Sequence, residues 1–283
     1  MKNKFILPLI MLNMLSGVGS LIMIFMTGGN PVWIGVLLTT LPLPFLLIVL
    51  TNVLKIARTS ARLPVIQVLS LSGLGLVAHT LYNLNEPLTM PYKAALGITV
   101  FGALFVQWYV WSYSNYGRKK SSAITKGRAL PDLRFTRLDN SQLSSSDFVG
   151  SKVLMVFFRA NWCPFCMNQL KEVLNRAAEL KKNNVQVKFI SNQGVGLSSE
   201  LAKSLDLPEH FEILQDDELK AAKALGIADI GGTPAGMSAY PADTVMATVI
   251  TLDEKGFVTF GDETDNYRVR PHPDVFMPVL EKS

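Results

Sequence analysis

Charged residues and cysteines are both scarce in this sequence. Only 17% of the 283 residues are Asp, Glu, Lys or Arg, against about 25% in ordinary soluble proteins. The two cysteines are too few for a disulfide-rich secreted scaffold. The 49% hydrophobic content excludes a disordered chain. The composition therefore favours a protein with a large membrane-type segment.

Charge is absent altogether from four long apolar stretches in the first 117 residues. Each meets or nearly meets the roughly 20 residues that a helix needs to cross a bilayer. The first is too long for the apolar part of a signal peptide, and no small-residue cleavage site follows it, so we expect it to be retained. We predict four transmembrane helices, over residues 5–26, 31–54, 63–81 and 94–113.

Basic residues collect on one side of these predicted helices. The other side has only Lys93. The positive-inside rule then places both termini, and everything after the fourth helix, in the cytoplasm of an inner (plasma) membrane that the chain crosses several times. The residues on the basic side are Lys2, Lys4, Lys55, Arg58, Arg62, Arg118, Lys119, Lys120, Lys126 and Arg128.

The predicted helices contain no cysteine, so they cannot relay electrons by thiol–disulfide exchange. His79 is their ionisable candidate. A single histidine without a partner is more often a helix-end residue that faces water or a neighbouring helix. We therefore expect residues 1–117 to form a helical membrane domain that contacts the lipid bilayer.

Residues 118–129 read as a basic juxtamembrane linker, and residues 130–283 as one compact domain. Residues 129–283 carry a net negative charge, which excludes a nucleic-acid-binding face as the source of the basic pI. Predicted strands alternate with predicted helices, which indicates an α/β layered domain. The strands are expected at 153–159, 185–190, 211–214, 247–252 and 257–261, and the helices at 164–182, 198–205, 217–225 and 273–282.

The motif that carries chemistry is Cys163-Pro164-Phe165-Cys166. It follows a predicted strand and opens a predicted helix, the setting of redox-active C-x-x-C pairs. Cys163 would be the helix N-cap, where backbone N–H groups and the helix dipole stabilise a thiolate. Pro164 suits the first helical turn, which needs no N–H from it. We expect Cys163 to attack and Cys166 to resolve.

Two other interpretations of the cysteine pair are weaker. A structural zinc site needs four ligands, and no further cysteine is present, while His210 and His272 lack ligand spacing. Inert buried thiols are uncommon at a helix start. We therefore expect neither a metal nor an organic cofactor.

Residues 128–283 resemble the thioredoxin-like superfamily, and within it the redoxin branch of the peroxiredoxins, the alkyl hydroperoxide reductase/thiol-specific antioxidant group. The resemblance depends on the entry Leu130-Pro131-Asp132-Leu133 and on the stretch from Val156 to Cys166. It continues in Leu252-Asp253-Glu254-Lys255-Gly256 and in Asn266-Tyr267-Arg268-Val269-Arg270-Pro271. It implies a thioredoxin-like fold and thiol-based reduction of a peroxide or a disulfide.

The sequence departs from that family's pattern at several positions. Peroxide-specialised members have Pro and Thr or Ser seven and three residues before the reactive cysteine, where this chain has Val156 and Ala160. Their arginine near a later strand corresponds here to residues 245–247, and the cis-proline of thioredoxins to Met246. The buried Asp of thioredoxins corresponds to Phe157, so no general base can be named.

Other residues beside the cysteines are candidates for supporting roles. Arg159 could lower a thiol pKa or hold an anionic substrate group, or it could pair with a surface acid. Trp162 could form a rim for a partner or pack beside the helix start, and for Phe165 packing is favoured. With Pro164 and Met246, Arg159 and Trp162 complete the predicted supporting set.

The sequence therefore predicts a membrane-anchored thiol–disulfide oxidoreductase that uses Cys163 and Cys166. Its substrate would be a protein disulfide or a peroxide, with an external thiol as electron donor. An extracytoplasmic reductase would require the opposite topology. A redox sensor that regulates a membrane scaffold or transporter is the alternative from another class.

Overall fold

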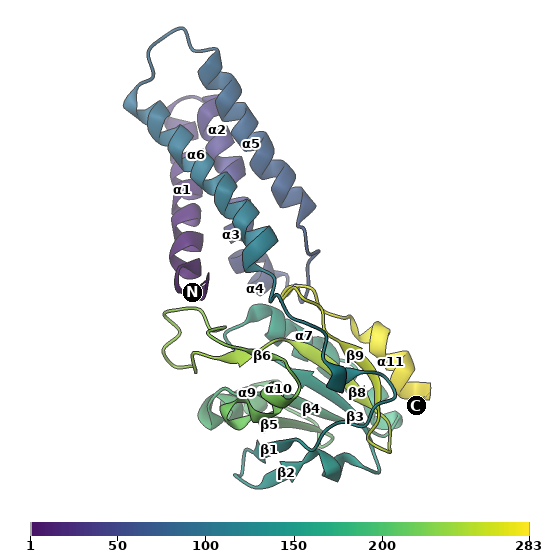
Figure 1. Cartoon of the computed structure of the whole chain (residues 1–283). Helices are drawn as coiled ribbons and strands as arrows, with labels where there is room; N and C mark the ends of the chain where they lie inside the picture. Colours follow the sequence, from purple (N-terminus) through teal and green to yellow (C-terminus); the bar gives the residue numbers. More distant parts are fainter. Residues whose placement is uncertain (1, 283) are drawn as a thin grey trace. The chain divides into compact units, whose positions relative to one another are not determined.

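The computed structural model of the chain describes residues 2–282, and it divides into two compact units. Among the described residues, the first unit comprises 2–56 and 60–115, and the second comprises Ala57–Thr59 and 116–282. The predicted order, long apolar helices followed by an α/β domain, is confirmed (Figure 1).

The first unit is helical. Within the described residues, four helical stretches are long and apolar enough to cross a membrane: Ile6–Met26, Pro31–Val53, Pro64–Tyr82 and Met90–Tyr113. The first and third are α1 (Ile6–Met26) and α5 (Pro64–Tyr82), while the fourth joins α6 (Met90–Trp108) to a π-helical turn, Tyr109–Tyr113. Because α6 begins at Met90, Lys93 lies in its first turns rather than in the preceding loop.

Prolines divide the second apolar stretch. It consists of α2 (Pro31–Thr40), α3 (Pro42–Pro44), a π-helical segment (Phe45–Leu50) and α4 (Thr51–Val53). A proline ring removes one N–H from the helical ladder and crowds the preceding turn, and a local π-helical adjustment relieves both effects. His79 lies exposed near the end of α5, beside Asn83.

Small residues let α2 and α5 approach closely. A Cβ at Gly73 would overlap the carbonyl oxygen of Gly35 and the hydroxyl of Thr39. The Thr39 hydroxyl donates to the carbonyls of Gly35 and Ser70, at 2.9 and 3.2 Å. Glycines and back-bonded threonines are typical of tight helix crossings in apolar bundles, where close backbone contact provides the attraction.

The second unit is built on a seven-stranded mixed sheet with the order β2-β1-β5-β4-β3-β8-β9. The strand β3 is central, since it pairs in parallel with β4 and antiparallel with β8. The strands are β1 (Arg134–Arg137), β2 (Gln142–Ser144), β3 (Lys152–Phe157), β4 (Val185–Ser191), β5 (Phe211–Gln215), β8 (Thr248–Leu252) and β9 (Val258–Asp262), with a separate pair β6 (Ala228–Asp229) and β7 (Thr244–Val245).

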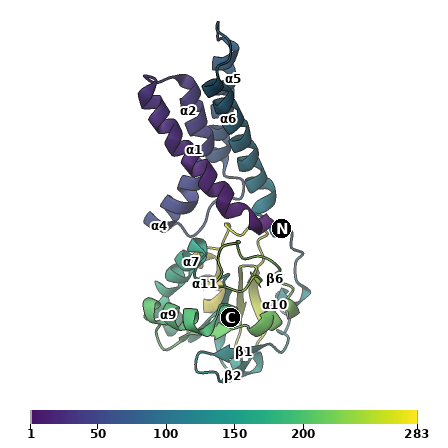
Figure 2. The same cartoon turned by 90° about the vertical axis from the view of Figure 1, so that its left-hand side faces the viewer.

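Helices cover both faces of this sheet. Figure 2 shows α7 and α9 on one side and α10 on the other. Residues 153–157 of β3 are all buried, because alternate side chains face helices on opposite faces of the sheet. The helices are α7 (Pro164–Leu174), α8 (Ala177–Lys182), α9 (Val195–Leu205), α10 (Lys220–Ala224) and α11 (Pro273–Lys282).

Most of the predicted elements of this unit are present within a few residues of their expected ends. The predicted helix 164–182 is interrupted, because α7 ends at Leu174 and α8 begins at Ala177. The antiparallel strands β1 and β2 were not predicted. Their alternating polar residues belong to the edge of the sheet, where one face stays wet.

The linker after the fourth apolar stretch is partly integrated into the second unit. The Arg118 N–H donates to Asp265, and the Arg118 guanidinium lies buried 3.9 Å from Glu263. Lys119 and Lys120 are exposed. Part of the positive charge of this segment is therefore neutralised inside the folded domain.

Candidate active site

The cysteine pair lies between the central strand and the helix that follows it. The strand β3 ends at Phe157, five residues form a loop, and α7 begins at Pro164 with Cys163 as its N-cap, as predicted. Cys163 is extended, with φ −91° and ψ 107°, and its side chain makes no capping hydrogen bond. The turn of helix from Cys163 to Cys166 places both sulfurs on the side that faces Arg270.

Both thiols are reduced and buried, with 1% of Cys163 and none of Cys166 exposed. The sulfur of Cys166 accepts the Arg159 backbone N–H at 3.4 Å and the Arg270 Nη2 at 3.3 Å. The same Nη2 lies 3.9 Å from the Cys163 sulfur. Hydrogen bonds and a cation directed at one sulfur favour its charged form.

The two thiols differ in acidity. Burial, together with the hydrogen bond that it donates to Cys166, raises the pKa of Cys163 well above its usual value. Burial also opposes ionisation of Cys166, but the hydrogen bond from Cys163, the Arg270 charge and the Arg159 N–H outweigh it and lower the pKa of Cys166 to about 5. These shifts favour the thiol form at Cys163 and the thiolate form at Cys166.

Arg270 is the residue that sequence reasoning missed. It is 4% exposed, and its Nη1 donates to Gln169 Oε1 of α7 at 3.0 Å. Burial lowers the pKa of Arg270, but the neighbouring cysteine sulfurs raise it further, so the net shift is upward and the guanidinium stays charged. Arg270 lies in the segment between β9 and α11.

The Arg159 guanidinium pairs with an acidic residue, which is one of the two roles considered for it. Its guanidinium lies 3.6 Å from Asp229 and also donates to the Gly232 carbonyl. It is also stacked between two aromatic rings, 4.8 Å from the Trp162 centroid and 5.2 Å from that of Tyr267. The guanidinium charge is thus paired with Asp229 and packed against aromatic rings. The backbone N–H of Arg159 donates a hydrogen bond to the Cys166 sulfur.

The other residues discussed in the sequence analysis lie in different surroundings, some beside the cysteines and some in the core. Trp162 is half-buried over Arg159, and Pro164 occupies the first turn of α7. Phe165 is buried and packs edge-on against Tyr267, 6.1 Å between centroids, so it is a core residue. Met246 packs against the sheet's hydrophobic core, and its N–H donates to the Ile227 carbonyl.

Tyr116 is a further residue near the site. Its hydroxyl accepts the Ala247 N–H at 3.1 Å. Burial of that hydroxyl raises the pKa of Tyr116, which the positive charges of Arg159 and Arg270 partly offset. The raised pKa keeps the tyrosine neutral.

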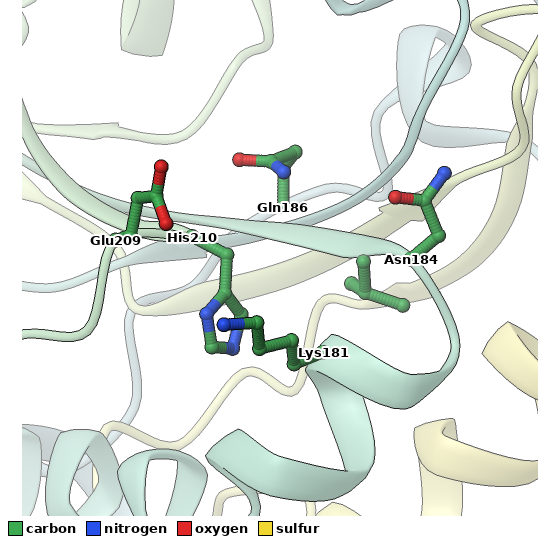
Figure 3. Close-up of a pocket in the computed structure, with 6 residues that line it drawn as sticks. Lys181, Asn184, Gln186, Glu209 and His210 are labelled. Carbon is green, nitrogen blue, oxygen red and sulfur yellow. The ribbon is translucent and has the colours of Figure 1, made fainter.

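A cavity of about 390 Å³ lies elsewhere in the domain, lined by Lys181, Asn184, Val185, Gln186, Glu209 and His210 (Figure 3). It borders the first residues of β4, whereas the cysteines follow the last residues of the parallel strand β3, so the two lie toward opposite ends of the sheet. Within residues 2–282, no group of three His, Cys, Asp or Glu side chains could hold a metal ion.

Comparison with known proteins identifies the family of this domain. The sequence model described as the AhpC/TSA family matches residues 126–260. The chain is 30% identical over 129 residues to the chloroplastic peroxiredoxin Q of Sedum lineare, and the match covers 44% of this chain and 68% of that protein. This chain belongs to the AhpC/TSA family. It is a peroxiredoxin-like redox enzyme with a thioredoxin-like fold.

Other relatives of this AhpC/TSA protein are also peroxiredoxins Q. It is 28% identical over 159 residues to the chloroplastic protein of Populus jackii, covering 56% of this chain and 68% of that one. It is 31% identical over 121 residues to the chloroplastic protein of Oryza sativa subsp. japonica, covering 42% and 55%. The chain thus spans between about half and two thirds of the length of these relatives.

Two solved structures are matched over nearly their whole length. Reduced Prx3 of Vibrio vulnificus in complex with hydrogen peroxide is 19% identical, with a TM-score of 0.49, over 56% of this chain and 99% of that one. Peroxidoxin BcpB of Mycobacterium tuberculosis is 17% identical, with a TM-score of 0.47, over 56% and 97%.

The sequence points to Arg270 only through the Asn266–Pro271 stretch noted for its family resemblance, and the burial of this residue became visible in the structure. The stretch from Asn266 to Pro271 contains two arginines, and both are buried, with Arg268 fully inaccessible. A buried arginine needs a partner, so two of them in a short segment indicate a site. Which partner each one finds depends on the fold.

Proposed function

We propose that this protein is a membrane-anchored thiol oxidoreductase in which Cys163 and Cys166 cycle between the dithiol and the disulfide, with a hydroperoxide as substrate. The observation that carries the proposal is the position of the Arg270 guanidinium, which lies 3.3 Å from the buried sulfur of Cys166 and 3.9 Å from that of Cys163. A thiolate is the nucleophilic form of cysteine, and a second thiol one helical turn away resolves the product.

The Cys166 thiolate serves as the general base that the sequence analysis could not name. Cys163 transfers its proton to the Cys166 thiolate and attacks the terminal oxygen of the hydroperoxide, so the O–O bond breaks and Cys163 becomes a sulfenic acid. The leaving alkoxide takes the proton back from Cys166 and departs as an alcohol. The Cys166 thiolate then attacks the Cys163 sulfur and releases hydroxide, which leaves a disulfide. Two electrons pass from the thiols to the peroxide, and an external thiol restores them.

The test measures hydroperoxide consumption by the full chain in detergent micelles. The reduced protein is mixed in stopped flow with hydrogen peroxide, and separately with an alkyl hydroperoxide, while tryptophan fluorescence is followed. Trp162, stacked on Arg159, provides a reporter beside the thiols. Oxidation no faster than that of free cysteine would contradict the peroxidase proposal.

Disulfide reduction is the second candidate, and the departures at Val156 and Ala160 favour it. The Thr or Ser that assists peroxide binding in the family is replaced by the methyl side chain of Ala160, which donates no hydrogen bond. Fast exchange with a model protein disulfide, combined with slow peroxide oxidation, would assign the protein to this class.

We further propose that the four apolar helices anchor the enzyme in the plasma membrane with the redox domain in the cytoplasm. The length and composition of the helices and the bias of basic residues support this orientation. A cytoplasmic domain would meet reduced thiol donors. Protease treatment of intact spheroplasts should leave the domain uncut, whereas cleavage would favour the extracytoplasmic reductase.

A redox sensor that regulates a membrane module remains the alternative from another class. A sensor would form the disulfide but would not turn over substrate with a thiol donor. Multiple turnovers in the presence of a dithiol donor would therefore exclude it.

A further inference from the structure

The segment that supplies Arg270 is held in place by a short part of the chain far away in sequence. Ala57–Thr59, between the second and third apolar stretches, belongs to the second unit. The Thr59 N–H donates to the Arg268 carbonyl at 3.0 Å, and the Thr59 hydroxyl accepts from Arg268 Nη1 at 2.6 Å. Arg58 Nε donates to the Arg270 carbonyl at 3.2 Å.

The other side of the same segment is held by the cysteine helix. Arg58 forms an ion pair with Glu172 of α7, and Arg270 Nη1 bonds to Gln169 of the same helix. Arg58 thus bridges the backbone of Arg270 and the helix that contains both cysteines. These contacts fix the distance between the Arg270 guanidinium and the sulfurs from two sides.

We propose that Arg58 and Thr59 are positioning residues of the redox site, which hold the backbone of residues 268–270 so that the Arg270 guanidinium stays against the Cys166 sulfur. The proposal rests on the proposed use of these thiols, and it assigns a function to a loop between two apolar helices beyond connecting them. Neither residue touches a sulfur, so each acts through Arg270.

A simpler explanation is that Arg58 acts through its own charge. The charged and titratable groups around the pair are Arg159 from the loop after β3, Arg270, Tyr116 from the linker, and Asp229 of β6. Glu172 and Arg58 lie farther out. If only charge mattered, removing Arg58 would raise the thiol pKa and removing Glu172 would lower it. If positioning matters, both changes raise it, because both release the backbone of Arg270.

The experiment measures the pH midpoint of iodoacetamide alkylation of the reduced full chain in detergent micelles, by mass spectrometry. The wild type is expected at about pH 5. Arg58→Gln and Glu172→Ala should each move the midpoint up by about one unit, a tenfold loss of thiolate at a pH below both midpoints. Lys55→Gln is the matched control: it removes one positive charge from an exposed residue of the same loop, and should leave the midpoint unchanged.

Thr59 gives an independent measurement without any change of charge. Thr59→Val removes the hydroxyl that accepts from Arg268 and should raise the midpoint, while Thr59→Ser keeps the hydroxyl and should restore it. Circular dichroism identifies any variant that fails to fold. The midpoints of the folded variants then decide whether Arg58 and Thr59 position Arg270. Opposite shifts for Arg58→Gln and Glu172→Ala, or midpoints that all equal the wild type, would overturn the proposal. Failure of the proposed function would appear separately, as a wild type that does not consume peroxide.

Discussion

In the reduced protein, Arg270 Nη2 lies 3.3 Å from the sulfur of Cys166 and 3.9 Å from that of Cys163. One buried cation therefore serves both members of the pair, and it is nearer to the second cysteine. The lowered pKa of Cys166 favours the thiolate at that residue, whereas the sequence pattern assigns the attack to Cys163. Both statements hold together if Cys166 accepts the proton of Cys163 when Cys163 attacks.

Replacing Arg270 tests this electrostatic arrangement. Arg270→Met removes the charge and keeps an apolar chain, so the pKa of Cys166 should rise by about 1–3 units from its value of about 5. The rate of alkylation at pH 6 reports the change. Arg176→Met, at a half-buried ion pair with Glu179, is the control and should leave the rate unchanged. An equal rate for wild type and Arg270→Met would contradict the assignment.

The two cysteine variants should differ in kind. Cys163→Ser is expected to abolish fast peroxide consumption, because the attacking sulfur is gone. Cys166→Ser should stop at a Cys163 sulfenic acid that dimedone traps, although more slowly, because the proton acceptor is lost too. Mass spectrometry of the trapped protein distinguishes them. A dimedone adduct on Cys166 in the Cys163→Ser variant, formed at the wild-type rate, would reverse the roles.

The stability of the reduced protein should depend on pH through Cys166. Its folded pKa of about 5 lies below the ordinary value of 9.0. The unfolded state then binds more protons between these values, so stability rises with pH across this window and is lost as pH falls toward 5. The difference in thermal midpoint between wild type and Cys166→Ser, both reduced, should grow from pH 5 to pH 8. A difference that is constant over this range would show that the folded thiol is not acidic.

The helical unit can be tested at its closest crossing. Gly73→Ala should destabilise the bundle by about 1–3 kcal/mol, because the new Cβ meets the Gly35 carbonyl and the Thr39 hydroxyl. Gly75→Ala, two residues along α5, meets nothing within 4 Å and is the matched control. Thermal unfolding in detergent micelles measures both. Equal midpoints for the two variants would indicate that the crossing is not closely packed.

Much of the fold follows from local patterns. The charge-free stretches predict the ends of the long helices to within a few residues. The change from a strand pattern to a helix pattern at Pro164 predicts the start of α7. The break between α7 and α8 and the edge strands β1 and β2 were not predicted. Their existence depends on packing against the rest of the sheet rather than on periodicity.

The candidate site divides in the same way. Cys163, Cys166, Pro164, Trp162 and Arg159 lie within eight residues of one another, so a strand-to-helix junction brings them together without any distant contact. Met246 was selected by analogy with thioredoxins, and it packs into the core instead.

By itself, the sequence determined the class of chemistry and the apolar half of the chain, because a C-x-x-C pair at a helix start and runs without charge are local features. Only the tertiary structure decided which thiol holds the charge and which cation stabilises it. Arg270 is more than 100 residues from the cysteines, and Arg58 and Thr59 are a similar distance away on the other side. Electrostatic energy depends on separation in space and on burial, and folding sets both.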